Sequence, residues 1–514
     1  MKLLKTGLPL LMACVLLSGC MQTSSAEPEA LTPLPLDQET VETTPSRSIL
    51  PDVFALPYAP DQTLDPVTCP DGMQQTVSSL LYESLFRLNE QLEPELWLCE
   101  SYTFLPVSEE RDFCSYVLQL REGVAFSDGS PLTAEDVKAT LERARKSERY
   151  GTRLSGVRSV SAEGNTLTIT LSSPNTGFTA LLDIPIVKSG TENALVPVGT
   201  GPYLFSTTDT AAYLVANQTW WRDEQRPTDF ILLAEAADRD TMLYRFSSHD
   251  VQLVTADLTG TRSISATGNV SYQDADTTVL QYLGCNTARE PLNNAALRRA
   301  LHMGFNRAHI VSAFLSGHGT AAQFPVSPVT SLYPTDLEER YSLDDFTAAL
   351  AECGYTAERT LALLVNSENP FKLSIAQHLA ENYTAAGVPV EVTALPWEEY
   401  TAALAAGEFD LYYGEVKLTA DWDLTALLGS DGALNLSGRE DPLTDQLLAA
   451  FSAADDRAAA MRALCSHLRM QAPILPICFK STSVLMQTDV LENLVSTMSE
   501  PFYGLTDCTI HLQE

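Results

Sequence analysis

The chain has only seven histidines, and the spacing of its reactive side chains does not match a catalytic motif. The sequence has no H-E-x-x-H, no G-x-S-x-G and no G-x-x-x-x-G-K motif, the patterns that place zinc ligands, a nucleophilic serine and a phosphate-binding loop. His302 and His309 are seven residues apart, but a predicted helix break at Asn306 separates them. We therefore expect no catalytic residue, no metal site and no cofactor.

The first twenty residues have the pattern of a secretory leader. Lys2 and Lys5 precede an apolar run over residues 7–17, which is shorter than the ~20 residues that a spanning helix needs. The run ends in Leu-Ser-Gly-Cys at Cys20, which resembles the bacterial lipobox, whose cysteine is acylated and becomes the mature N-terminus. This resemblance implies a lipid anchor on the extracytoplasmic face of a cell membrane, at a cell surface or in a periplasm. An ordinary signal peptide with a chance cysteine is the alternative.

A polar segment follows the leader. Residues 21–47 are rich in Thr, Ser, Glu and Pro and bury too little apolar surface to offset chain entropy. Proline keeps such a segment extended. We expect a disordered tether that holds a folded body away from the membrane.

The charge balance limits the class of partner. The chain has 32 basic and 66 acidic residues, for a net charge of −34. Such a chain is unsuited to nucleic acid, whose phosphates need Lys and Arg, and to direct adhesion to an anionic membrane face. The body beyond the tether is long enough for about two or three core-forming units.

Eight cysteines lie in the body, and none of them has C-x-x-C spacing, so zinc and redox chemistry are not indicated. An even number in an exported protein allows disulfides. Cys99 and Cys114 flank a predicted turn at residues 106–112, between two strand-like runs. We expect this hairpin to place the two cysteines side by side as a candidate disulfide, with unpaired buried cysteines as the alternative.

Helix and strand patterns alternate along the body. Apolar spacing predicts a helix over residues 77–85, and Thr133 is a predicted N-cap, as is Asn306. Gly354 and Gly387 suit helix ends. Further predicted strands cover residues 102–105, 116–120, 166–171, 388–395 and 409–416, and further helices cover 294–303, 307–315, 344–353, 371–386 and 398–406. The alternation indicates an α/β fold with largely parallel strand pairing.

Four stretches together resemble the oligopeptide/dipeptide/nickel-binding family of extracytoplasmic solute-binding proteins, which serve ABC importers. They occur in the family's order and extend over most of the chain beyond residue 50: residues 120–137 (LREGVAFSDGSPLTAEDV), 197–203 (PVGTGPY), 291–301 (PLNNAALRRAL, followed by Asn306-Arg307), and 395–400 (LPWEEY, with GEFD at 407–410).

The resemblance implies an α/β fold of the periplasmic-binding-protein type II class, with two lobes, a hinge and an extra subdomain. Lobe one is expected at residues 48–284 plus 485–514, with the extra subdomain at about 70–190. Lobe two is expected at residues 285–484. Solute is expected to bind between the lobes, which close over it.

The implied function is capture of peptides and their delivery to the permease subunits of an ABC transporter, by a protein that is a monomer and not an enzyme. Nickel or metal-chelate binding, or binding of another small solute, is the alternative on the same fold. A peptide-sensing lipoprotein coupled to a receptor is a further alternative.

The resemblance also assigns candidate ligand contacts. In peptide-binding members, an Ala-Asp-aromatic segment supplies a carboxylate for the peptide ammonium, and Asp421 in residues 418–423 (LTADWD) matches it. A cation taken out of water needs an anionic partner. Trp397 matches a tryptophan of the cleft in some members, and Asn435 matches a recurrent asparagine. Trp422 adds an aromatic surface, and Lys417 is the nearby base.

One departure from the family concerns the ligand's other end. Peptide-binding members often carry basic residues before the Asp421 segment, whereas residues 402–415 contain no Lys or Arg. Tight capture of a short peptide's carboxylate is therefore in doubt. Longer peptides, or a different solute with a positive end, remain open.

Overall fold

The computed structural model describes residues 50–70, 72–264 and 269–513. The predicted leader and tether, including Cys20, lie outside these residues. Within the described part of the chain, no helix is long and apolar enough to cross a membrane.

The first sheet of lobe one has four strands, in the order β1-β10-β9-β8. Its core joins Phe54 and Tyr203 to Val484 and Leu505, so both ends of the body meet there. Helix α1 packs against β1. The elements of this part are β1 (Ala55–Tyr58), α1 (Met73–Ser78), β8 (Tyr203–Thr207), β9 (Ala212–Ala216), β10 (Phe230–Glu235), α3 (Arg239–Ser247), β18 (Leu491–Glu492) and β19 (Thr509–Ile510).

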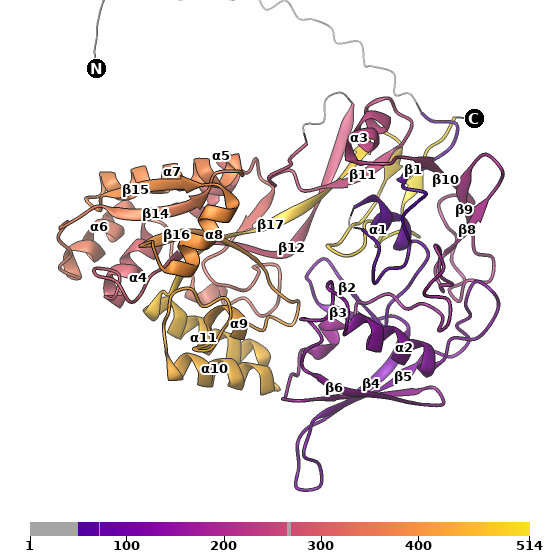
Figure 1. Cartoon of the computed structure of the whole chain (residues 1–514), viewed down its shortest axis with the longest axis horizontal. Helices are drawn as coiled ribbons and strands as arrows, with labels where there is room; N and C mark the ends of the chain where they lie inside the picture. Colours follow the sequence, from indigo (N-terminus) through magenta and orange to yellow (C-terminus); the bar gives the residue numbers. More distant parts are fainter. Residues whose placement is uncertain (1–49, 71, 265–268, 514) are drawn as a thin grey trace, which may run out of the picture. The chain divides into compact units, whose positions relative to one another are not determined.

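A second four-stranded sheet, in the order β4-β5-β7-β6, is antiparallel throughout and lies within the range predicted for the extra subdomain (Figure 1). Helix α2 packs on it. Thr133 caps this helix as predicted, because its hydroxyl accepts from Asp136 N–H while the Asp136 carboxylate accepts from Thr133 N–H. The elements are β2 (Phe86–Leu88), β3 (Pro94–Leu96), β4 (Cys99–Leu105), β5 (Ser115–Leu120), α2 (Ala134–Ala144), β6 (Val157–Glu163), β7 (Thr166–Leu171) and η1 (Phe178–Leu181).

The seven-stranded sheet has the order β11-β17-β12-β16-β14-β15, with β13 paired to β17. Helices cover it and build lobe two (Figure 1). Asn306 caps α5, and Gly354 and Gly387 adopt positive φ after α6 and α7, as predicted. The strands are β11 (Leu253–Ala256), β12 (Val270–Cys285), β13 (Gly319–Ala321), β14 (Leu361–Asn366), β15 (Val390–Leu395), β16 (Leu411–Lys417) and β17 (Ile474–Gln487). The helices are α4 (Ala295–Met303), α5 (Arg307–Phe314), η2 (Thr335–Leu337), α6 (Leu343–Glu352), α7 (Pro370–Ala385), α8 (Trp397–Ala406), α9 (Thr425–Leu428), α10 (Pro442–Ala453) and α11 (Arg457–Gln471).

The long strands β12 and β17 connect the two lobes. Their pairing is interrupted between Asp276 and Leu280. On one side of this break, Val484 of β17 packs in the lobe-one core. On the other side, Leu475 packs in the lobe-two core. A break in the ladder between two separate cores is a suitable place for a hinge. The α/β fold class is thus confirmed, whereas the exact lobe boundaries stay predictions.

Three predictions about local structure were wrong. Among the described strands, only the pairs β1–β10, β14–β15 and β14–β16 are parallel, because most other neighbours are joined by hairpins or by the long hinge strands. The predicted helix over residues 77–85 ends at Ser78. It stops because the backbone at Leu80 and Leu81 pairs with residues 201 and 203 instead.

The candidate Cys99–Cys114 disulfide is the third, and the alternative of unpaired buried cysteines holds for this pair. The hairpin register pairs Cys99 with Leu120, and Leu105 with Ser115, so the two cysteines lie at opposite ends of the ladder. Their thiols face different carbonyls, those of Ser101 and Ser173. Both cysteines are free.

Candidate functional site

A cavity of about 950 Å³ is lined by both lobes. Its volume lies within the ~300–1,000 Å³ typical of small-molecule sites. Lobe two contributes residues 417–420, and Thr278 contributes from the hinge. Lobe one contributes residues from five segments: 66–70, 75–88, 147–153, 183–185 and 498–500.

The lobe-two wall is the segment that follows β16. Thr278, in the break of β12, donates through its hydroxyl to Leu418 C=O at 2.6 Å and accepts at its backbone carbonyl from Leu418 N–H at 2.9 Å. Two hydrogen bonds therefore attach this wall directly to the hinge, so movement at the hinge moves the wall.

The lobe-one wall is built around two arginines beyond the end of α2. Arg149 donates to the carbonyl oxygens of Pro66 and Cys69. Arg153 donates to Leu181 C=O at 3.0 Å and forms an ion pair with Asp183, which also accepts from Ser499 Oγ at 2.9 Å. Burial lowers the pKa of the Arg153 guanidinium to about 10, so it stays cationic at neutral pH.

Glu500 brings a carboxylate to the same wall. It forms a 2.6 Å ion pair with Arg87. The Arg87 guanidinium lies between two aromatic rings, 4.2 Å from the ring centre of Trp97 and 4.1 Å from that of Tyr503. Stacking and ion pairing together fix the position of this carboxylate.

Behind the wall, Glu83 is buried in a cage of donors. Its carboxylate accepts from the indole N–H groups of Trp97, Trp220 and Trp221 and from Thr200 Oγ1. Burial raises the pKa of Glu83 above its ordinary value, even though these donors act in the opposite direction. Tyr82 and Ser84, on either side of Glu83, line the cavity, so the cage positions part of the wall.

The PVGTGPY stretch at residues 197–203 supports the same segment. A Cβ built on Gly201 would lie 2.5 Å from the carbonyl carbon of Leu81. Gly201 N–H donates to Leu81 C=O at 2.9 Å, and Tyr82 Oη donates to Pro197 C=O at 2.9 Å. Glycine is needed here because the two backbones approach so closely.

Of the predicted ligand residues, the structure places Lys417 at the cavity wall, where it is exposed. Asp421 is only 3 % exposed, and it does not line the cavity, although its neighbour Ala420 does. The Asp421 carboxylate accepts from Asn175 Nδ2 of lobe one at 2.7 Å.

The two predicted tryptophans lie away from the cavity wall. Trp422 is 1 % exposed in the lobe-two core and packs edge-on against Phe479. Trp397, the first residue of α8, is 54 % exposed and stacks on Tyr400. Neither side chain lines the cavity, so the ligand roles of both remain predictions.

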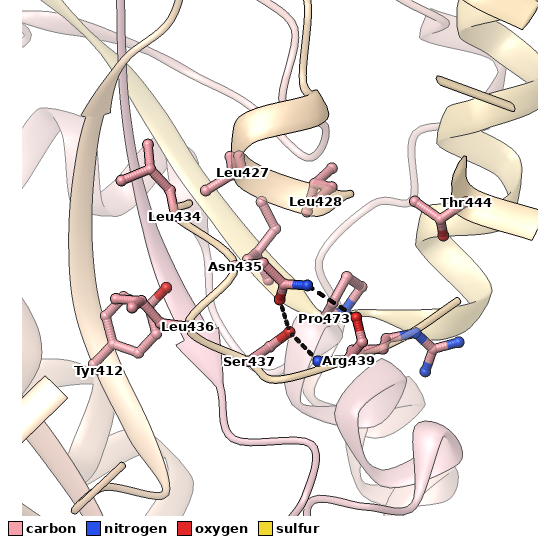
Figure 2. Close-up of a pocket in the computed structure, with 11 residues that line it drawn as sticks. Tyr412, Leu427, Leu428, Leu434, Asn435, Leu436, Ser437, Arg439, Thr444 and Pro473 are labelled. Atoms are coloured by element: carbon pink, nitrogen blue, oxygen red, sulfur yellow. Dashed lines mark hydrogen bonds between the residues drawn. The ribbon is translucent and has the colours of Figure 1, made fainter. Parts of the chain in front are cut away.

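Asn435 lies in a small pocket of lobe two with a volume of about 10 Å³, which has room for about one water molecule. Figure 2 shows its side-chain amide joined by hydrogen bonds to Ser437 and Arg439. It donates to the carbonyls of Gly429 and Arg439 and accepts from Ser437 Oγ at 2.5 Å. These bonds order the loop over residues 429–439.

Sequence reasoning missed the lobe-one wall entirely. Arg149 and Arg153 share one loop, Asp183 and Glu500 come from two others, and no motif marks them. The neighbouring tryptophans Trp220 and Trp221 were a usable signal, because adjacent large aromatics in a strand-rich region indicate a packed site.

Residues 93–430, more than half of the chain, match the family model described as bacterial extracellular solute-binding proteins, family 5 middle. The chain belongs to this family. It is 26% identical over 392 residues to the glutathione-binding protein GsiB of Escherichia coli (strain K12), an alignment that covers 72% of this chain and 76% of that protein.

Solved structures share the fold. The nickel ABC transporter protein of Bacillus halodurans matches with a TM-score of 0.74 and 23% identity, over 90% of this chain and 100% of the other. The murein tripeptide binding protein MppA in its unliganded open form matches with a TM-score of 0.71 and 22% identity, over 91% and 99%. The fold is therefore the type II fold of the solute-binding proteins of ABC importers, which are binding proteins and not enzymes.

Proposed function

We propose that this protein is a lipid-anchored, extracytoplasmic binding protein that captures peptides in the cavity between its lobes and delivers them to an ABC permease. The observation that carries the proposal is the cavity of about 950 Å³ whose walls come from both lobes and from the hinge. Such a site can hold a ligand by lobe closure and release it intact by reopening, without covalent chemistry.

The charge of the cavity supports a ligand with both charge signs. In the whole chain, acids outnumber bases by 66 to 32. The described lining residues break this pattern, because the acids are matched by as many bases: Glu148, Asp183 and Glu500 against Arg149, Arg153 and Lys417. A peptide with free ends carries both charges, and each end needs a partner when it leaves water.

The two charged residues predicted to contact the ligand, Lys417 and Asp421, differ in their position relative to the cavity. Lys417 lines the cavity and is our candidate partner for a peptide carboxylate. Asp421 as the partner of the ammonium stays a prediction, since its carboxylate is bonded to Asn175 and would have to exchange that bond for the ligand.

The metal alternative has less support in the structure. Within the described residues, no group of three or more His, Cys, Asp and Glu side chains could hold a metal ion. A metal complex would have to bring its own chelator and bind through that chelator's polar groups.

Mass spectrometry of the solute released from purified protein tests the proposal. We expect peptide masses after denaturation and none from a mock purification. A sample that releases only metal complexes or sugars would overturn the peptide assignment. Stimulation of ATP hydrolysis by a reconstituted permease encoded beside the gene tests delivery, whereas a response from a neighbouring receptor alone would favour the sensing alternative.

A further inference from the structure

A loop of the extra subdomain contacts lobe two at a place separate from the hinge. The loop follows β7 and contains Asn175, Thr176 and Gly177. Thr176 N–H donates to Ser452 C=O at 2.9 Å, and Thr176 Oγ1 donates to Ala454 C=O at 2.7 Å. These acceptors lie at the end of α10 and in the turn before α11.

Asn175 of this loop contacts a charged group of lobe two. Its Nδ2 donates to the Asp421 carboxylate at 2.7 Å. Its own backbone is held from behind, since Tyr116 Oη of β5 donates to Asn175 C=O at 2.8 Å, and Asn175 Oδ1 accepts from Gly177 N–H at 3.0 Å. The amide is therefore oriented before it meets Asp421.

Arg457 completes the contact from lobe two. Its guanidinium donates to the backbone carbonyl of Asp421 and lies directly against Gly177, where an added Cβ would overlap it. Gly177 has φ −95°, an ordinary value, so glycine is needed there for space and not for backbone freedom. The loop at Gly177 and the Arg457 guanidinium are therefore in van der Waals contact.

This contact adjoins the cavity without being part of its wall. Ala420, directly before Asp421, lines the cavity. Burial lowers the pKa of the Arg153 guanidinium on the opposite wall, and the Asp421 carboxylate acts in the opposite direction. Any separation of Asn175 from Asp421 therefore moves the two walls apart.

We infer that Asn175 and Asp421, supported by Arg457 and Gly177, form an interlobe clasp that, while it is closed, fixes the spacing of the two walls of the cavity. In this role Asp421 is a positioning residue, and its carboxylate serves lobe one in place of a ligand ammonium. The effect on ligand affinity rests on the proposed function, whereas the clasp itself does not.

An exchanged pair separates the clasp from an ammonium site. In Asn175→Asp/Asp421→Asn the hydrogen bond can form with donor and acceptor reversed, but residue 421 no longer carries a charge. Asn175→Ala and Asp421→Ala each remove the bond, and Gly177→Ala pushes Arg457 away. Ser173→Ala, at an exposed position of the same loop, is the matched control.

Hydrogen–deuterium exchange of the full-length, ligand-free protein is the first test. We expect faster exchange at residues 173–178 in the three single variants, because Thr176 N–H loses its partner Ser452. Exchange in the exchanged pair and in Ser173→Ala should match the wild type. Unchanged exchange in Asn175→Ala and Asp421→Ala would overturn the clasp.

Peptide release is the second test, with a tryptic digest of casein as the probe and native mass spectrometry as the readout. We expect dissociation about tenfold faster in Asn175→Ala and Asp421→Ala, since a hydrogen bond to a charged group is lost, with unchanged association and with rescue in the exchanged pair. Tighter binding by Asn175→Ala, or no rescue, would instead make Asp421 the ammonium site. If the wild type retains no peptide, the proposal that the ligand is a peptide is rejected. The hydrogen–deuterium exchange experiment, which needs no ligand, then tests the clasp by itself.

Discussion

The Arg87 guanidinium lies 2.6 Å from the Glu500 carboxylate, and it joins the first strands of the body to its last loop. Trp97 and Tyr503 enclose the cation on two sides. Glu500 in turn lines the cavity. A contact that stabilises lobe one thus also fixes the position of a charged group in the cavity wall.

Removing this cation should destabilise lobe one. Arg87→Met leaves Glu500 without its partner, and we expect a loss of about 2 kcal/mol in the free energy of unfolding, below the range for fully buried pairs because Glu500 is 25% exposed. Urea denaturation measures it. Because the charges are coupled, Arg87→Met/Glu500→Gln should lose less than the two single variants together. Strictly additive losses would show that the pair contributes nothing.

Gly201→Ala should be poorly tolerated. Its Cβ would lie 2.5 Å from the Leu81 backbone, which is closely packed and cannot yield, so we expect a loss of about 2–3 kcal/mol. Gly156→Ala is the control, since its Cβ would meet nothing within 4 Å. Thermal unfolding of both variants measures the difference. Equal melting temperatures would contradict the close approach that the structure shows.

Asp128 should contribute a pH-dependent part of the stability. Hydrogen bonds from Lys188 and Ser130 lower the pKa of Asp128 to about 2. Because the folded-state pKa lies below the unfolded one, this stability is present at neutral pH and is lost as the pH falls from the ordinary carboxyl range toward 2. The amount should stay below about 1 kcal/mol, because Asp128 is 40% exposed.

The measurement is the stability gap between wild type and Asp128→Asn in urea, followed from pH 7 to pH 3. We expect the gap to shrink toward low pH. In a Lys188→Met background, the difference in stability at pH 7 between Asp128 and Asp128→Asn should be mostly lost. A gap that does not change with pH would refute this role of Asp128.

Cys20→Ser should release the protein from the membrane. The expected lipid is attached to this thiol, and without it residues 21–47 would leave the membrane together with the folded body. Detergent phase partitioning of the wild type and the variant, with blotting, measures the anchor. Cys508→Ser, at a buried cysteine of the body, is the control. Equal partitioning of Cys20→Ser and wild type would show that the chain is not anchored through Cys20.

Features that depend on neighbouring residues were predictable from the sequence. Thr133 and Asn306 cap their helices as expected, because a cap is a bond between residues three positions apart. The family followed in the same way from four contiguous stretches. Strand pairing was less predictable. The direction of a neighbouring strand depends on the connection that brings the chain back to the sheet. The register depends on the turn, as the pairing of Cys99 with Leu120 shows.

The sequence by itself determined that this chain is an α/β solute-binding protein of family 5. Each motif is a contiguous stretch that can be recognised on its own, and four such stretches in the family's order indicate the family together. Only the tertiary structure decided which side chains meet in the cavity and beside it. Glu500 reaches it from the end of the chain through Arg87, and Asp421 meets Asn175 across 246 positions. Such contacts depend on how two lobes pack around a hinge, and no spacing along the chain encodes that distance.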